Sequence, residues 1–180
     1  MIKSRLYKKE DYKKIINFLS EMYRVNKNQH CWLPSRWEYA VHLVNPLYVE
    51  RGNKSWEPFI KIWEDEHEIV GISHPEETFN AFLQIRPGYR DLEEEMIDWA
   101  EESISKYIDD DKKKLVIWIN DSDTYRKNIL KNRNYKKGDT CSYLNRMNLD
   151  KEFIAELPEG YRFRTMEEEI SFVKRYNVLN

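Results

Sequence analysis

The segment IRPGYRDLEEEMIDWAEE, from Ile85 to Glu102, places a strand end, a turn and a helix start in succession. Such a turn can bind phosphate, because the first backbone N–H groups of a helix have no intrahelical partners. Arg90 adds a cation there, and Gly88 is the last glycine before the helix. Glu93–Glu95 follow in the first helical turn, which suits the helix dipole but would repel a phosphate. The segment predicts an anion site that is weakened or replaced by the protein's own carboxylates.

Other reactive residues show no spacing that indicates a site. The four histidines lack an HxxxH or HExxH pattern, so we expect no metal site. No GxSxG or Cys–His pattern supports a covalent nucleophile, and no GxGxxG or Walker loop is present. The two cysteines, Cys31 and Cys141, form no CxxC pair, which favours reduced thiols.

The composition is that of a globular chain. Its 180 residues are 41% hydrophobic and 34% charged, which is enough for one well-cored domain. The formal charge of −2 gives no basic excess, so we do not expect nucleic acid as a partner. The start of the chain has no apolar signal region, and no apolar run approaches about 18 residues. We therefore expect a cytoplasmic protein without a membrane span.

The elements that must position the turn alternate between strands and helices. Residues 2–7 alternate like a strand, and apolar residues recur at three- and four-residue steps over 12–23, as in a helix. Pro34 and Ser35 start a second helix. Residues 59–63 and 69–73 predict a hairpin.

The second half continues the alternation around the turn. Residues 78–85 alternate strictly and predict a strand, and the helix after it extends to Tyr107. Residues 115–120 form a continuous apolar run, typical of a strand buried on both faces. Asp121, Ser122 or Asp123 caps the next helix, 124–133, whose apolar side holds Tyr125 and Ile129. Residues 140–149 then close the sheet.

This order predicts an α/β fold of the α+β kind: a mixed, mostly antiparallel central sheet flanked by helices, with one parallel strand pair. We expect one domain over residues 1–155. Residues 156–180 repeat the opening pattern of strand, acidic turn and helix. They either begin a truncated second copy or complete the first sheet.

The element order and the stretch FLQIRPGYR resemble the GNAT superfamily of acetyl-CoA-dependent N-acetyltransferases. The resemblance implies a splayed strand pair that holds acetyl-CoA, with the signature R/Q-x-x-G-x-G/A around its pyrophosphate. Arg90 matches the R/Q position, but Glu93 and Glu95 stand at the two glycines. The resemblance therefore implies a cofactor site whose binding is weakened or lost. Its candidate residues are Leu83, Gln84, Ile85, Arg90, Asp91 and Leu92.

The catalytic residues that the resemblance implies are also incomplete. In the family, a tyrosine acts as general acid toward the departing CoA thiolate. Leu130 stands at its position, and Tyr125 could replace that tyrosine only if the helix were rotated. Otherwise Tyr125 is a core-facing aromatic. Candidate proton acceptors are His74, Glu76 and, above all, Glu77, in a turn that is otherwise simply solvated. Residues 28–39, rich in aromatic rings, shape an acceptor pocket or form a lid on the core.

Two functions follow from the resemblance. The first is a transferase that passes the acetyl group of acetyl-CoA to a primary amine of a small-molecule acceptor, by direct attack in a ternary complex. The second is a catalytically degenerate GNAT-like domain, kept for structure, dimerisation or ligand sensing. An exposed strand edge in an incomplete second unit would favour a homodimer.

Overall fold

The computed structural model describes residues 1–26, 31–76, 79–110, 112–142 and 156–162. The chain divides into two units, Met1–Lys137 and Gly138–Asn180. The elements given below belong to the first unit. The domain boundary expected at residue 155 lies outside the described residues, as do 143–149 of the predicted closing strand and 163–180 of the predicted C-terminal helix.

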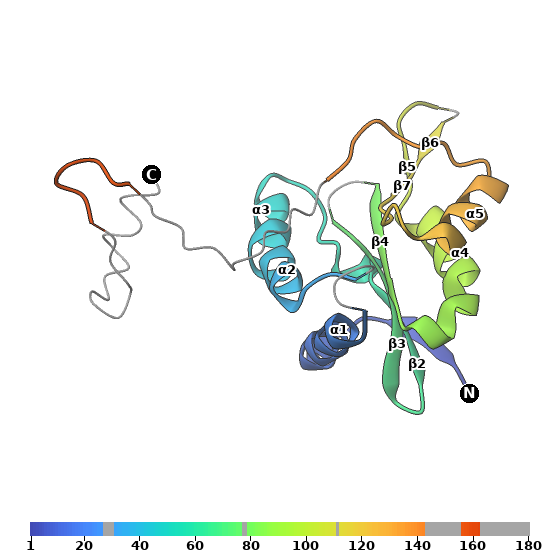
Figure 1. Cartoon of the computed structure of the whole chain (residues 1–180). Coiled ribbons are helices and arrows are strands. Elements are labelled where there is room, and N and C mark those ends of the chain that lie inside the picture. Colours follow the sequence, from blue (N-terminus) through green and yellow to red (C-terminus); the bar gives the residue numbers. More distant parts are fainter. Residues whose placement is uncertain (27–30, 77–78, 111, 143–155, 163–180) are drawn as a thin grey trace. The chain divides into compact units, whose positions relative to one another are not determined.

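The first unit is built on a five-stranded sheet with the order β1-β2-β3-β4-β7 (Figure 1). Neighbouring strands from β1 to β4 are antiparallel, and β4 and β7 are parallel. The prediction of a mixed, mostly antiparallel sheet with one parallel pair is confirmed. The strands are β1 Lys3–Leu6, β2 Lys61–Asp65, β3 Glu68–Pro75, β4 Asn80–Ile85 and β7 Val116–Ile117.

The parallel pair is short. The N–H of Val116 donates to the carbonyl of Phe79 at 2.8 Å, and the N–H of Trp118 donates to that of Ala81 at 3.2 Å. The pairing register stops at Ala81, whereas β4 continues to Ile85. The predicted strand 115–120, buried on both faces, is thus wrong in length and burial, because only two of its residues form the strand and these are half-buried.

Helices cover the two faces of the sheet (Figure 1). The helices α1 to α3 lie on one side of the strands, and α4 and α5 lie on the other. A π-helical turn, Ala40–Val44, connects α2 to α3, and a 3-10 turn, Pro87–Leu92, leads into α4. The helices are α1 Tyr12–Asn26, α2 Pro34–Tyr39, α3 Asn45–Glu50, α4 Glu93–Ser103 and α5 Thr124–Asn132.

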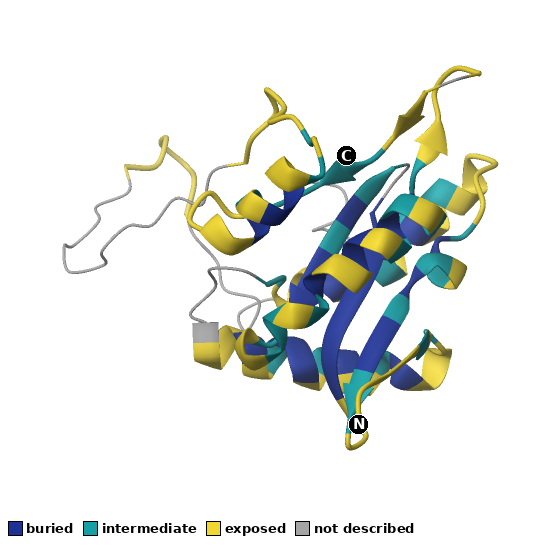
Figure 2. Cartoon of the chain, turned by 90° about the vertical axis from the view of Figure 1, so that its right-hand side faces the viewer, coloured by how far each residue is buried: buried dark blue, intermediate teal, exposed yellow. Residues whose placement is uncertain are grey.

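Each face of the sheet has its own apolar core. Successive strand residues point to opposite faces. In β2, Ile62 accordingly packs with Ile15 and Leu19 of α1, whereas Trp63 packs with Met96 of α4. Figure 2 shows the central strands buried between helices that keep an exposed outer surface.

Close packing of α4 on β3 fixes the start of α4 against the sheet. A Cβ atom at Gly71 would lie 3.3 Å from the Sδ atom of Met96, which is tighter than most real contacts. Glu93 precedes Met96 by three residues and therefore lies on the same side of α4, facing the sheet. The missing side chain at Gly71 thus helps to bring Glu93 beside β4.

The helix after the turn is shorter than the sequence predicts. The helix expected to reach Tyr107 ends at Ser103, and Tyr107 lies in the exposed strand β5, Lys106–Tyr107. This strand pairs with β6, Lys113–Lys114. In the described part of the chain, no helix has both the length and the apolar character needed to cross a membrane.

Candidate functional site

A buried carboxylate–guanidinium pair lies between α4 and α5. Glu93 in the first turn of α4 is 0% exposed, and Arg126 in the first turn of α5 is 3% exposed. The Nε atom of Arg126 donates to Oε2 of Glu93 at 2.8 Å. Arg90, in the turn before α4, also forms an ion pair with Glu93 through its Nε atom. Glu93 therefore has a guanidinium at each of its two oxygens.

Asp123 completes this network from the start of α5. It caps the helix by accepting the backbone N–H of Arg126 at 3.1 Å, so it is the cap among the three predicted candidates. It also accepts a hydrogen bond of 2.7 Å from Nη2 of Arg90. Burial alone would raise the pKa of Asp123, but the hydrogen bonds from Arg90 and the Arg126 N–H, with the two guanidinium charges, lower it overall. Asp123 is thus held ionised.

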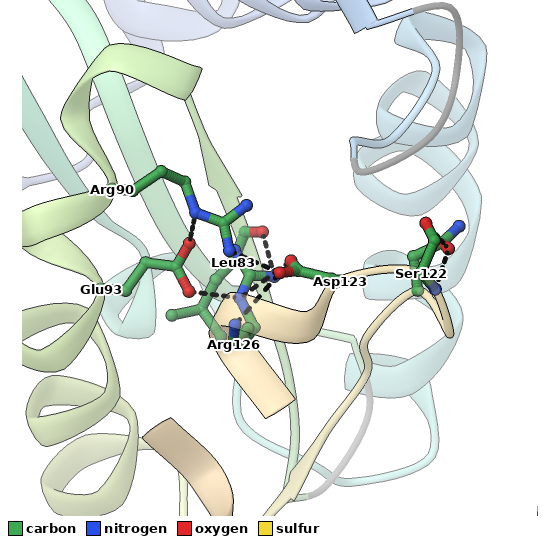
Figure 3. Close-up of polar contacts among 7 residues, drawn as sticks. Leu83, Arg90, Glu93, Ser122, Asp123 and Arg126 are labelled. Carbon is green, nitrogen blue, oxygen red and sulfur yellow. Dashed lines mark hydrogen bonds and ion pairs between the residues drawn. The ribbon is translucent and has the colours of Figure 1, made fainter. Parts of the chain in front are cut away.

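The network is anchored to the part of β4 that extends beyond its pairing with β7. The Nη1 atom of Arg126 donates a hydrogen bond of 3.1 Å to the carbonyl oxygen of Leu83. Leu83 lies two residues beyond Ala81, the last β4 residue in register with β7. Figure 3 shows the side chains of Arg90, Glu93, Asp123 and Arg126 converging beside Leu83. We call these four side chains the β4 ion-pair network.

The network is electrically balanced, since two guanidinium groups face two carboxylates. Buried charges are tolerated only when they are paired and hydrogen-bonded. An added anion would meet the carboxylates of Glu93 and Asp123, and it would have to displace one of them to reach Arg126. As arranged, the network joins α4, α5 and β4 through the protein's own charges.

Turn geometry before α5 supports the position of Asp123. The backbone N–H and the hydroxyl of Ser122 donate to Oδ1 of Asn120 at 2.9 and 2.8 Å (Figure 3). Such side-chain-to-backbone bonds fix short turns. The turn delivers Asp123 to the helix start, from which it reaches Arg90.

The predicted cofactor residues are only partly brought together. Leu83 and Arg90 are linked in the network, because Arg126 bonds the Leu83 carbonyl and both arginines contact Asp123. The side chain of Gln84 is buried and does not join the network, because its Oε1 accepts a hydrogen bond of 2.8 Å from the backbone N–H of Trp32. The remaining three residues do not join the network: Ile85 is buried in the core, Leu92 packs half-buried against it, and Asp91 is exposed.

Tyr125, a predicted catalytic candidate, lies on the surface of α5. It is 47% exposed, and the Cζ atom of Arg90 lies 5.1 Å from its ring centroid. The expectation that Tyr125 faces the core is wrong, because α5 turns Ile129 and Leu130 inward, together with Arg126. Glu77, the other catalytic candidate, lies outside the described residues.

His74 and Glu76 are not exposed proton acceptors. Glu76 is buried and lies 2.5 Å from the guanidinium of Arg36, so the expected solvated turn is wrong at this residue. His74 is fully buried on β3, and burial lowers its pKa to about 3. Its Nδ1 lies 3.2 Å from the carbonyl of Pro75, and its Nε2 lies 3.2 Å from Nε2 of Gln84. A neutral ring that donates from Nδ1 and accepts at Nε2 satisfies both contacts.

The aromatic region after α1 packs on this buried histidine. The rings of Trp32 and His74 have centroids 4.4 Å apart, and those of Trp37 and His74 are 5.1 Å apart. Trp37 is completely buried in the core of the α1 face. Trp32 and Trp37 thus pack beside the buried His74, and 28–30 lie outside the described residues.

The sequence carries a signal for the buried charges in the spacing of the apolar residues that follow them. Glu93 lies three and four residues before the buried Met96 and Ile97, and Arg126 lies three and four residues before the buried Ile129 and Leu130. These spacings place each charge on the buried face of its helix. An acid and a base that both lie on buried helix faces are expected to pair.

Neither a protein-family model nor a curated protein matches the chain. Among the described residues, no group of three or more His, Cys, Asp or Glu side chains could hold a metal ion.

Proposed function

We propose that the chain is a catalytically degenerate GNAT-like domain. Its acetyl-CoA site is closed, and its role is structural, dimerising or ligand-sensing. The family assignment rests on the resemblance of residues 69–102 and on the element order. Three antiparallel pairings precede a parallel pair, and a helix follows each of β4 and β7, as the resemblance implies. The end of the β4–β7 pairing at Ala81 supports the splayed pair that the resemblance also implies.

The observation that carries the closed site is the contact between Arg126 and Leu83. In GNAT enzymes, the backbone of the fourth strand pairs with the pantetheine arm of the cofactor. Here the Leu83 carbonyl is already bonded to the protein's own guanidinium at 3.1 Å. Glu93, at the first glycine position of the pyrophosphate signature, is ion-paired to Arg90 and Arg126. A carboxylate of the protein therefore takes the cations that a pyrophosphate would use.

The proton-transfer groups support the same proposal. Attack by an amine on the thioester requires a base within hydrogen-bond reach. His74 is buried and already hydrogen-bonded, and Glu76 is ion-paired to Arg36. With these two described candidates engaged, catalysis would rely on positioning and backbone polarisation. Glu77 lies outside the described residues.

An active transferase is the second candidate, and one observation favours it. Tyr125 is exposed beside Arg90, at the edge of the network, where an acid toward a departing thiolate could stand. In this candidate, acetyl-CoA displaces Glu93 from the two arginines, and its acetyl group passes to a small-molecule amine.

Thiol release from acetyl-CoA, measured with a panel of primary amines, tests the proposal. We expect no release above the rate of the amines without protein. The Tyr125→Phe variant is the matched control, because it removes the hydroxyl of the exposed ring beside Arg90. Turnover by the native chain that Tyr125→Phe abolishes would establish the second candidate and overturn the closed site.

A further inference from the structure

A pocket opens at the opposite end of β4 from the ion-pair network. Its volume is about 200 Å³. Phe79, directly before β4, forms one wall, and Ile104 after α4 forms another. Trp56 and Phe59, from the segment before β2, add two further aromatic rings. The pocket thus has aromatic rings in a lining that also carries polar groups.

Cations surround this interior. Lys54 and Lys106 line the pocket. The Nζ atom of Lys106 lies 5.2 Å from the ring centroid of Phe59, and that of Lys114 lies 4.7 Å from the ring centroid of Phe79. Among the described residues, no acidic side chain lines the pocket and none of these three lysines has a carboxylate partner.

The strand pairing beside the pocket concentrates this charge. Lys106 of β5 lies directly opposite Lys114 of β6. Like charges at directly opposed positions of an antiparallel pair are destabilising. An anion seated between the rings and the ammonium groups would relieve this repulsion, and partial desolvation by the aromatic walls would strengthen the attraction.

We propose that this pocket binds a small carboxylate carried on a single apolar or aromatic ring. A cavity of about 150 Å³ can hold benzene, so this pocket has room for one ring and a carboxylate but not for a nucleotide. The ring lies against Trp56, Phe59 and Phe79, and the carboxylate faces Lys54 and Lys106. This site is independent of the proposed acetyl-CoA chemistry, because none of its lining residues belongs to the β4 ion-pair network.

Titration with benzoate tests the site, followed through the indole N–H signals of the tryptophans in two-dimensional NMR. Benzamide is the neutral ligand of the same shape, and inorganic phosphate is an anion without a ring. We expect benzoate to shift the Trp56 signal, assigned with Trp56→Phe, and to bind about tenfold more tightly than benzamide or phosphate. Raising the salt concentration should weaken benzoate binding, because the lysines are solvent-exposed.

Lysine variants locate the charge. Lys54→Met and Lys106→Met should each weaken benzoate binding several-fold, whereas Lys13→Met, on the exposed face of α1, should leave it unchanged. Equal binding of benzoate and benzamide would overturn the proposal, as would equal binding of benzoate and phosphate. Absence of saturation by about 10 mM benzoate would also overturn it.

Discussion

Arg126 of α5 donates a hydrogen bond of 3.1 Å to the backbone carbonyl of Leu83 in β4, at the point where β7 no longer pairs with that strand. The guanidinium thus takes over an acceptor that a neighbouring strand would otherwise use. It also joins the sheet to Glu93, because its Nε atom bonds that carboxylate at 2.8 Å. Arg126 therefore couples the part of β4 beyond its pairing with β7 to both α4 and α5.

Removing the Glu93 charge should destabilise the fold strongly. Glu93→Ala leaves the buried guanidinium of Arg126 without its main partner, and losing one member of a buried pair typically costs about 3–5 kcal/mol. The free energy of unfolding from urea titration measures this loss. Glu94→Ala is the control, because that side chain is 69% exposed and its change should stay within about 0.5 kcal/mol. Equal effects of the two variants would contradict the buried network.

Replacing both partners should cost less than the two single losses together. In Glu93→Met with Arg126→Met, neither unpaired charge remains buried, and apolar side chains of similar length fill the space. We expect a double-mutant cycle to give a coupling energy of about 1–3 kcal/mol in favour of the pair. Simple additivity of the two single changes would show that Glu93 and Arg126 do not interact.

Acid should destabilise the protein through His74. Its pKa is about 6.5 when unfolded and about 3 when folded, because burial disfavours the charged ring. Between these values the unfolded chain binds more protons, so stability is complete above pH 6.5 and falls as the pH decreases. We expect a loss of about 2–3 kcal/mol between about pH 6.5 and 4.5.

The lowered carboxylate pKa values of Asp11 and Asp123 act in the same direction, but mainly below about pH 4. His74→Gln should therefore flatten the stability profile above pH 4.5. His42→Gln, at an exposed position, should leave the profile unchanged. A native profile that is already flat above pH 4.5 would contradict the burial of His74.

A side chain at Gly71 should push α4 away from β3. Gly71→Val brings a branched side chain against Met96, whose Sδ atom would lie 3.3 Å from the new Cβ. Overpacking of this kind typically costs about 1–3 kcal/mol. Gly88→Ala is the comparison, because a Cβ there meets nothing within 4 Å. A shift in the thermal midpoint for Gly71→Val but not for Gly88→Ala checks the packing.

The sequence predicts the sheet better than the site. Alternation and helical spacing placed β1 to β4, α1 and α5 close to their observed bounds, because each buries one apolar face. The strand at 115–120 was predicted too long, since an apolar run does not reveal that only Val116 and Ile117 pair with β4. Pairing depends on neighbours that are distant in the sequence.

The site depended on long-range contacts of this kind. Glu93 was expected to interact with the helix dipole, but it is ion-paired to Arg126, 33 residues away. Tyr125 was placed inside because it is aromatic, although Arg126 takes the buried position next to it. At both positions a charged side chain is buried because an oppositely charged partner neutralises it.

Calorimetric titration of the native chain with acetyl-CoA tests the closed site most directly. With Glu93 held by Arg90 and Arg126, and the Leu83 carbonyl already bonded, we predict no saturable binding up to about 1 mM acetyl-CoA. Stoichiometric binding in the micromolar range would mean that the cofactor displaces Glu93 from its arginines. That result would contradict the closed site.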